Sequence, residues 1–87
     1  MNFELLIKKM TRAAVQGNGA TVADCFTADG VYHDVFYGNF TGQDIARMIE
    51  GYFHRDGENF RWDIFEPVEQ RNMGYARYVF SYGSRLP

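Results

Sequence analysis

Residues 26–53 read FTADGVYHDVFYGNFTGQDIARMIEGYF and pass from a helix end through a strand into a capped amphipathic helix. The predicted strand, residues 31–36, carries one carboxylate among aromatic residues. Because side chains of a half-buried strand alternate between its two faces, Tyr32, Asp34 and Phe36 are expected on one face, opposite His33. An ionised carboxylate buried without a partner is costly. Asp34 must therefore find hydrogen-bond donors, become protonated or stand at the wet mouth of a cavity.

Two helices are predicted before this strand. Asn2 can cap a first helix whose apolar residues recur at helical spacing until Gly17, a stop signal. Asn18 can cap a short second helix in which Cys25 and Phe26 face inward. Cys25 is the only cysteine, which excludes an intrachain disulfide and a zinc site built from cysteines. We expect it to be a small buried hydrophobe without a reactive role.

A third helix is predicted after residues 41–44, Thr-Gly-Gln-Asp, which resemble a capping box. An apolar stripe follows at helical spacing and marks the buried side, formed by Ile45, Met48, Ile49, Tyr52 and Phe53. The other side carries Glu50 and His54, an i, i+4 pair that is expected to make only a solvated surface contact.

Two long strands are predicted after Gly57, where the hydrophobic period changes from helical to alternating. Phe60, Trp62 and Ile64 alternate with other residues until Pro67, which is expected to end the first strand. Residues 70–72 are expected to form a hairpin connection to a second strand over about residues 73–82. Both faces of this second strand carry apolar or aromatic groups, so it needs cover on each side.

The composition limits the kinds of partner. The chain has 87 residues, a formal net charge of −2 and no dense run of Lys or Arg, which argues against a nucleic-acid surface or a membrane-binding patch. Aromatic residues make up 17% of the chain and predict a core or cavity lined by rings. The N-terminus lacks the features of a signal peptide, and no apolar run reaches membrane-spanning length. We therefore expect a soluble, cytoplasmic protein.

Several kinds of catalytic site are not expected. Neither His33 nor His54 has a companion at metal-ligand spacing, so the sequence predicts no metal. Glycine-rich phosphate loops, nucleophile elbows and Ser/His/Asp orders are missing from the sequence, which disfavours nucleotide hydrolysis and acyl-enzyme chemistry. No cofactor is predicted.

The order of the predicted elements, with particular residues, resembles the cone-shaped superfamily of nuclear transport factor 2-like proteins, and within it the SnoaL-like branch. The resemblance covers most of the chain and is carried by Gly17-Asn18, Phe26, Asp29-Gly30-Val31, Asp34, Gly38 and Thr41-Gly42-Gln43-Asp44-Ile45. It implies an α+β fold with three N-terminal helices packed on a curved, mostly antiparallel sheet. Family members continue through further strands, so it also implies that residues 1–87 are a single domain that is partial at its C-terminus. This superfold hosts many unrelated activities.

The resemblance implies several activities, because the superfamily includes polyketide cyclases, ketosteroid isomerases, dehydratases and epoxide hydrolases. Asp34 falls where the isomerases carry their general base, which works with an oxyanion hole made from a tyrosine and a protonated aspartic acid. The position of that tyrosine holds Met10, which cannot donate a hydrogen bond, and the second acid would lie beyond Pro87. Only part of the isomerase apparatus is therefore present.

We derive three functional hypotheses. In the first, the protein binds a small apolar or polycyclic molecule, and Asp34 abstracts a proton beside a carbonyl; the pocket is expected to contain Met10, Tyr32, Phe36, Tyr52, Trp62, Tyr78 and Phe80. In the second, the chain is a non-catalytic dimerisation or interaction module, and a homodimer is expected in either case. In the third, it is a hydrolase or dehydratase of the same fold, which needs polar groups deep in the cone.

Asp34 also has a purely structural interpretation. In that alternative its carboxylate accepts hydrogen bonds from nearby backbone or from Tyr32, Tyr37 or arginine side chains, and only fixes a bend.

Overall fold

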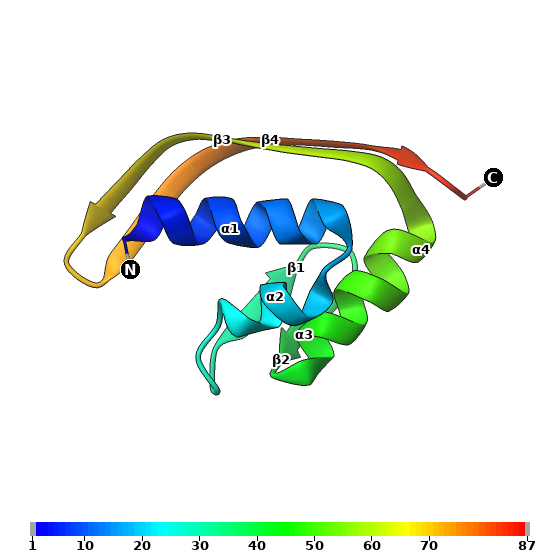
Figure 1. Ribbon diagram of the computed structural model, residues 1–87, viewed down its shortest axis with the longest axis horizontal. Helices are drawn as coiled ribbons and strands as arrows, with labels where there is room; N and C mark the ends of the chain where they lie inside the picture. Colours follow the sequence, from blue (N-terminus) through cyan, green and yellow to red (C-terminus); the bar gives the residue numbers. More distant parts are fainter. Residues whose placement is uncertain (1, 87) are drawn as a thin grey trace.

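A long β-hairpin arches over the helices in the computed structural model, which describes residues 2–86 (Figure 1). The helical elements are α1 (Phe3–Gln16), α2 (Gly19–Asp24) and a continuous segment made of α3 (Gln43–Met48), the π-helical turn η1 (Ile49–Phe53) and α4 (His54–Asp56). The strands are β1 (Val31–Asp34), β2 (Gly38–Thr41), β3 (Gly57–Gln70) and β4 (Met73–Ser84). The predicted α+β class with three helical segments is confirmed.

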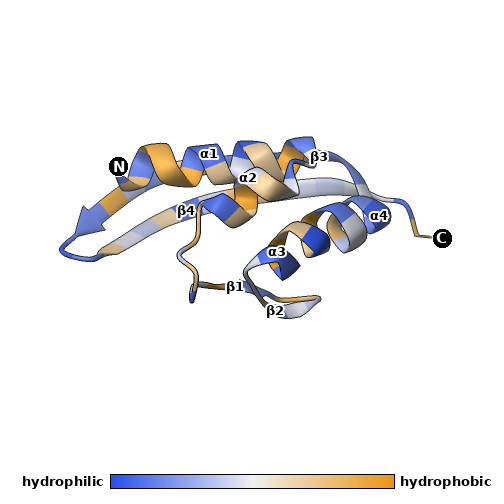
Figure 2. Cartoon of the chain, turned by 60° about the horizontal axis from the view of Figure 1, so that its bottom comes forward, coloured by the Kyte–Doolittle hydropathy of each residue, from blue (hydrophilic) through white to orange (hydrophobic). Residues whose placement is uncertain are grey.

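The first helix begins and ends where the sequence predicts, whereas the second begins as predicted but ends at Asp24, before Cys25 and Phe26. Asn2 Oδ1 accepts a hydrogen bond of 2.8 Å from Leu5 N and caps α1. Gly17 ends that helix in the left-handed region at φ 77°, a conformation that favours glycine. Asn18 Oδ1 accepts from Thr21 N at 3.1 Å and caps α2. Figure 2 shows hydrophobic and hydrophilic residues alternating along α1, as expected for a helix with one buried face.

The capping box predicted for the third helix is wrong. Gly42, at φ 54°, occupies the N-cap position and no side chain caps the helix. Thr41 is instead the last residue of β2, where it pairs with Val31, and Asp44 pairs with Arg47. Because Thr41 belongs to β2, it does not cap the helix.

The strands form two separate antiparallel sheets, where one curved sheet was expected. β1 pairs with β2, and β3 pairs with β4. The predicted strand 31–36 ends at Asp34, because residues 35–37 turn back into β2, a strand that the sequence reading missed. Phe36 therefore lies in a turn and is 75% exposed, so the regular alternation with Tyr32 and Asp34 stops before it.

Pro67 does not end the first long strand, contrary to the prediction. β3 continues to Gln70, and its register against β4 shifts between Phe65 and Val68. A β-bulge leaves a residue outside the hydrogen-bonded ladder, so proline is tolerated there. The hairpin turn itself falls at Arg71 and Asn72, within the predicted connection.

The core lies between the helices, with β1 covering one side. Its fully buried large side chains are Val22 from α2 and Ile45, Met48 and Ile49 from the third helical segment. α2 and α3 approach closely at Gly19, where an added Cβ would lie 2.5 Å from the carbonyl oxygen of Ala46. Glycine is required at this position by the close packing of the two helices.

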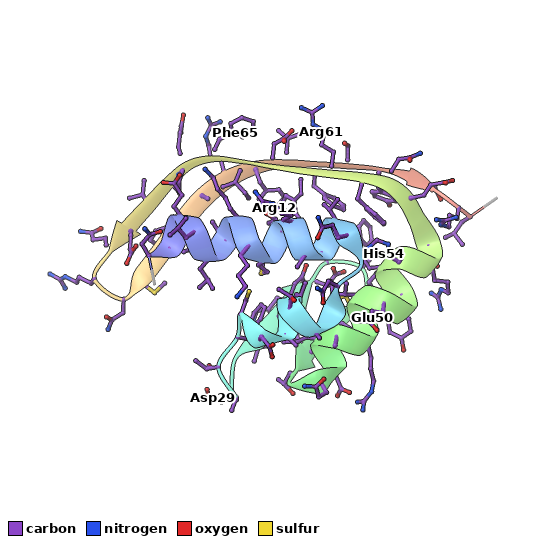
Figure 3. The ribbon with its side chains drawn as sticks, in the orientation of Figure 1. Arg12, Asp29, Glu50, His54, Arg61 and Phe65 are labelled. Atoms are coloured by element: carbon purple, nitrogen blue, oxygen red, sulfur yellow. The ribbon has the colours of Figure 1, made fainter. Side chains whose placement is uncertain are left out.

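Glu50 and His54 do not form the solvated surface pair that was predicted. Both face the junction of α1 and α2 (Figure 3), where Glu50 Oε2 accepts from Gly19 N at 3.1 Å and His54 Nε2 donates to the Ala14 carbonyl at 2.8 Å. The carboxylate thus pairs with an N–H at the start of α2, and the imidazole is a second donor to the Ala14 carbonyl, which also accepts from Gly17 N. These two bonds fasten the third helical segment to the first two helices.

The hairpin has an outer face that no other described element covers. Arg61 and Phe65 project from β3 away from α1 (Figure 3). Ion pairs between Arg61 and Asp63 and between Arg77 and Glu66 lie on exposed side chains of the hairpin. Among residues 2–86, no helix is both long and apolar enough to cross a bilayer.

Candidate functional site

A cavity of about 430 Å³ lies under the inner face of the β3–β4 hairpin. Residues from α1, from β1 and the turn that follows it, from the end of the third helical segment and from both long strands line it. The volume falls within the usual range for small-molecule sites. A second hollow, of about 290 Å³, lies beside α1 and the start of α2 and is smaller.

Aromatic rings form the hairpin wall of this cavity. Trp62 and Phe80 are directly opposite each other across the two strands and meet edge to face at 5.2 Å between ring centroids. Tyr78 contacts Trp62 in the same manner at 5.7 Å. Tyr78 is 60% exposed and Tyr82 is 45% exposed, although both line the cavity. Much aromatic surface in this wall therefore remains uncovered.

Six of the seven predicted pocket residues line the cavity: Met10, Tyr32, Phe36, Trp62, Tyr78 and Phe80. The seventh, Tyr52, lies elsewhere, with its ring against Tyr37 and Phe40 and the Arg55 guanidinium 5.1 Å from its centroid. Phe53, one residue later, takes the place at the cavity. The prediction assumed a regular 3.6-residue period, whereas residues 49–53 form a wider π-helical turn.

Asp34 stands at the cavity where β1 ends. Its Oδ1 accepts hydrogen bonds from Phe36 N at 2.8 Å and from Tyr37 N at 3.0 Å. These are the bonds of an Asx turn, which match the structural interpretation of this residue. Both bonds engage Oδ1, and among residues 2–86 Asp34 forms no ion pair. Oδ2 therefore remains available to a ligand.

The sequence reading missed a second polar group at the cavity, formed by Tyr37 and Asp56. Tyr37 Oη donates to Asp56 Oδ2 at 2.6 Å, and Arg55 donates from Nε and Nη2 at 2.7 and 3.0 Å. The hydrogen bonds from Arg55 and then from Tyr37 lower the pKa of Asp56 to about 2. Burial, followed by the bond to Asp56, raises the pKa of Tyr37 to about 12. Tyr37 and Asp56 are nineteen positions apart, a separation that leaves no spacing signal in the sequence.

The phenol of Tyr32 resists ionisation inside the cavity. Burial is the main cause that raises its pKa to about 12, and the negative charge of Asp34 adds to it. The indole Nε1 of Trp62 is buried and has no hydrogen-bond partner among the described residues. A buried donor without a partner costs about 1–3 kcal/mol of stability. A ligand whose acceptor atom reaches this N–H would remove that cost.

Two further candidate groups do not contribute to a reactive centre. Cys25 lies outside the cavity lining, and burial raises the pKa of its thiol, which disfavours the nucleophilic thiolate. His33 lines the cavity, and its Nδ1 donates to Asn39 Oδ1 at 2.7 Å across the β1–β2 pair. No group of three His, Cys, Asp or Glu side chains within residues 2–86 is arranged to hold a metal ion.

The chain matches no protein-family model, and neither the curated proteins nor the solved structures contain a significant match to it. The resemblance to nuclear transport factor 2-like proteins stays a prediction from the residues that carry it.

Proposed function

We propose that this protein binds a small, flat, largely apolar molecule in the cavity under the hairpin, with Asp34 as its polar anchor. The observation that carries the proposal is the set of uncovered aromatic rings that face one cavity beside a carboxylate without an ion pair. Rings supply apolar contact area, and a single charged group fixes the orientation of the ligand. The unpartnered indole N–H of Trp62 favours a ligand that also carries an acceptor such as a carbonyl.

The same geometry supports proton abstraction beside a carbonyl, the reaction that the isomerase and cyclase resemblance implies. Asp34 would be the base, acting through Oδ2 while Oδ1 holds the turn. Met10 lines the cavity but donates no hydrogen bond, so this site would hold a developing enolate with fewer donors than an isomerase has. A slow exchange reaction is therefore expected.

The test follows deuterium exchange at the carbon beside the carbonyl of a bicyclic ketone, such as 2-tetralone, by proton NMR. We expect the protein to accelerate exchange and Asp34→Asn to reduce the acceleration about 10²-fold or more. Asparagine preserves the Asx turn, so the fold should survive. Asp63→Asn makes the same charge change on the hairpin and is the control. If Asp34→Asn leaves both ketone binding and exchange unchanged, the proposal is abandoned.

A second function, self-association through the hairpin, is favoured by its uncovered outer face. Four apolar side chains there are between 44% and 59% exposed: Phe65, Val68, Tyr75 and Val79. Each long strand also pairs with only one neighbour among residues 2–86, which leaves an edge open to another strand. This function needs neither Asp34 nor the cavity.

Sedimentation equilibrium over a range of concentrations tests this second function. We expect a dimer that weakens at least tenfold in Val79→Lys and that cavity ligands do not affect. Leu5→Lys is the control, because Leu5 on α1 is 61% exposed but lies outside the hairpin. A chain that stays monomeric at every concentration rejects self-association and leaves the cavity function in place.

A further inference from the structure

The two charged side chains that line the cavity are both carboxylates. Asp34 and Asp56 line it, whereas no lysine or arginine does. Arg55 lies beside Asp56 and holds both of its oxygens, so the charge of Asp56 is largely offset. Asp34 has no such partner among residues 2–86. One negative charge without an ion-pair partner therefore lines a hollow whose other residues are mostly apolar or aromatic.

The aromatic rings of the lining also favour a positively charged ligand. The π-face of an aromatic ring carries partial negative charge and attracts an organic cation placed within about 6 Å of the centroid. Tyr78 and Tyr82 line the cavity and are 60% and 45% exposed, and Trp62, the ring type that holds cations best, lies beside Tyr78. Several aromatic rings and the carboxylate of Asp34 thus line the same volume.

Negative charge is already disfavoured in this space. Burial, and in part the charge of Asp34, raises the pKa of Tyr32 to about 12. An anionic ligand group would meet the same cost of burial and the same negative charge, with no lysine or arginine in the lining to offset them.

From these observations we infer that the cavity selects a positively charged hydrophobic molecule, an aryl or alkyl ammonium, with Asp34 as its counter-ion and the rings of Trp62, Tyr78 and Tyr82 around its charged head. The inference rests on the binding function proposed above, because it names the charge of the ligand. It does not depend on proton abstraction, since a counter-ion needs no turnover.

Three matched probes separate charge from shape: benzyltrimethylammonium, its neutral isostere neopentylbenzene, and the anion benzylsulfonate. Trp62 is the only tryptophan and lines the cavity, so its fluorescence reports binding of each probe directly. We expect the ammonium to bind at least about tenfold more tightly than the sulfonate, by Coulomb attraction at a site that is only partly shielded from water. Added salt should narrow this difference.

Asp34→Asn supplies the decisive comparison. We expect it to weaken binding of the ammonium about tenfold and to leave binding of neopentylbenzene within about twofold, while Asp63→Asn changes neither. Retained binding of the neutral probe also shows that the variant cavity is folded.

The outcomes distinguish this inference from the proposed function. If the neutral probe binds but the sulfonate binds as tightly as the ammonium, or if Asp34→Asn leaves the ratio of ammonium to neutral affinity unchanged, the charge selectivity is rejected and the cavity function stands. If none of the three probes binds, both are rejected. Should the Asp34 variant fail to fold, the comparison of ammonium and sulfonate in the unmodified protein, with its salt dependence, still decides the question.

Discussion

At the residue scale, one hydroxyl ties the mouth of the cavity to the helix behind it. Tyr37, in the turn after β1, donates to Asp56 at the end of α4, and Asp34 accepts from the backbone N–H of the same tyrosine. The side chain of Asp56 is only 15% exposed. Tyr37 therefore holds the β1–β2 turn, and with it Asp34, in place.

This contact predicts a stability that depends on pH at both extremes. The folded pKa of Asp56 is lowered from 3.8 to about 2, so its contribution is present above pH 3.8 and is lost as the pH falls toward about 2. The folded pKa of Tyr37 is raised from 10.0 to about 12, so its contribution is present below pH 10.0 and is lost as the pH rises toward about 12. We expect Tyr37→Phe to destabilise the protein most near neutrality.

Urea unfolding of the two proteins across these pH ranges provides the measurement. The difference in unfolding midpoint between the parent and Tyr37→Phe should shrink both at acid and at alkaline pH. Tyr75→Phe is the control, because Tyr75 lies on β4 with an exposed side chain and no hydrogen bond from its hydroxyl among the described residues. A difference for Tyr37→Phe that is the same at every pH would show that the hydroxyl does not act through Asp56.

At the element scale, the hairpin depends on a contact with the start of α1. The Phe3 ring packs directly on Gly74 of β4, so closely that an added Cβ would overlap its ring atoms, and Phe3 N donates to Glu69 Oε1 of β3 at 2.9 Å. We expect Gly74→Ala to displace Phe3 and to destabilise the fold by about 1–3 kcal/mol.

Gly51→Ala is the matched control for this substitution. An added Cβ at Gly51 meets nothing within 4 Å, and the residue lies in a helical segment, so alanine should stabilise the protein by up to about 1 kcal/mol. Chemical unfolding of both variants checks the pair. Equal and small effects of the two substitutions would mean that Phe3 does not anchor the hairpin.

The elements that the sequence predicted well are those whose signals are local. Asn2, Gly17 and Asn18 act through hydrogen bonds and backbone angles within a few residues of themselves, and their roles are confirmed. Thr41 is ambiguous by contrast, because it fits both a cap and a strand end, and only the pairing with Val31 decides between them. β2 was missed for the same reason, since a four-residue strand is defined by its partner more than by its own residues.

At the scale of the whole molecule, the cavity shows what the hydrophobic pattern of the sequence can and cannot predict. Alternation along the strands was enough to place Trp62, Tyr78 and Phe80 on a common face. The meeting of Tyr37 with Asp56, and of His54 with Ala14, depends on how helices and hairpins pack over long sequence separations, which no local period encodes. The position of Tyr52 could not be predicted either, because the apolar residues of the third helix give no sign of a π-helical turn.

α1 is held by contacts at both of its ends. One end of α1 is joined to the turn end of the hairpin at Phe3 and Glu69, the other end is joined to the third helical segment at Ala14 and His54, and that segment continues directly into β3 (Figure 1). α1 has fourteen residues and a length of about 21 Å, and it connects these two contacts beneath the curved hairpin. The bend determines how far the rings stand from β1. We therefore expect the size of ligand that fits to depend on the length of α1, which lines the cavity through Met10 alone.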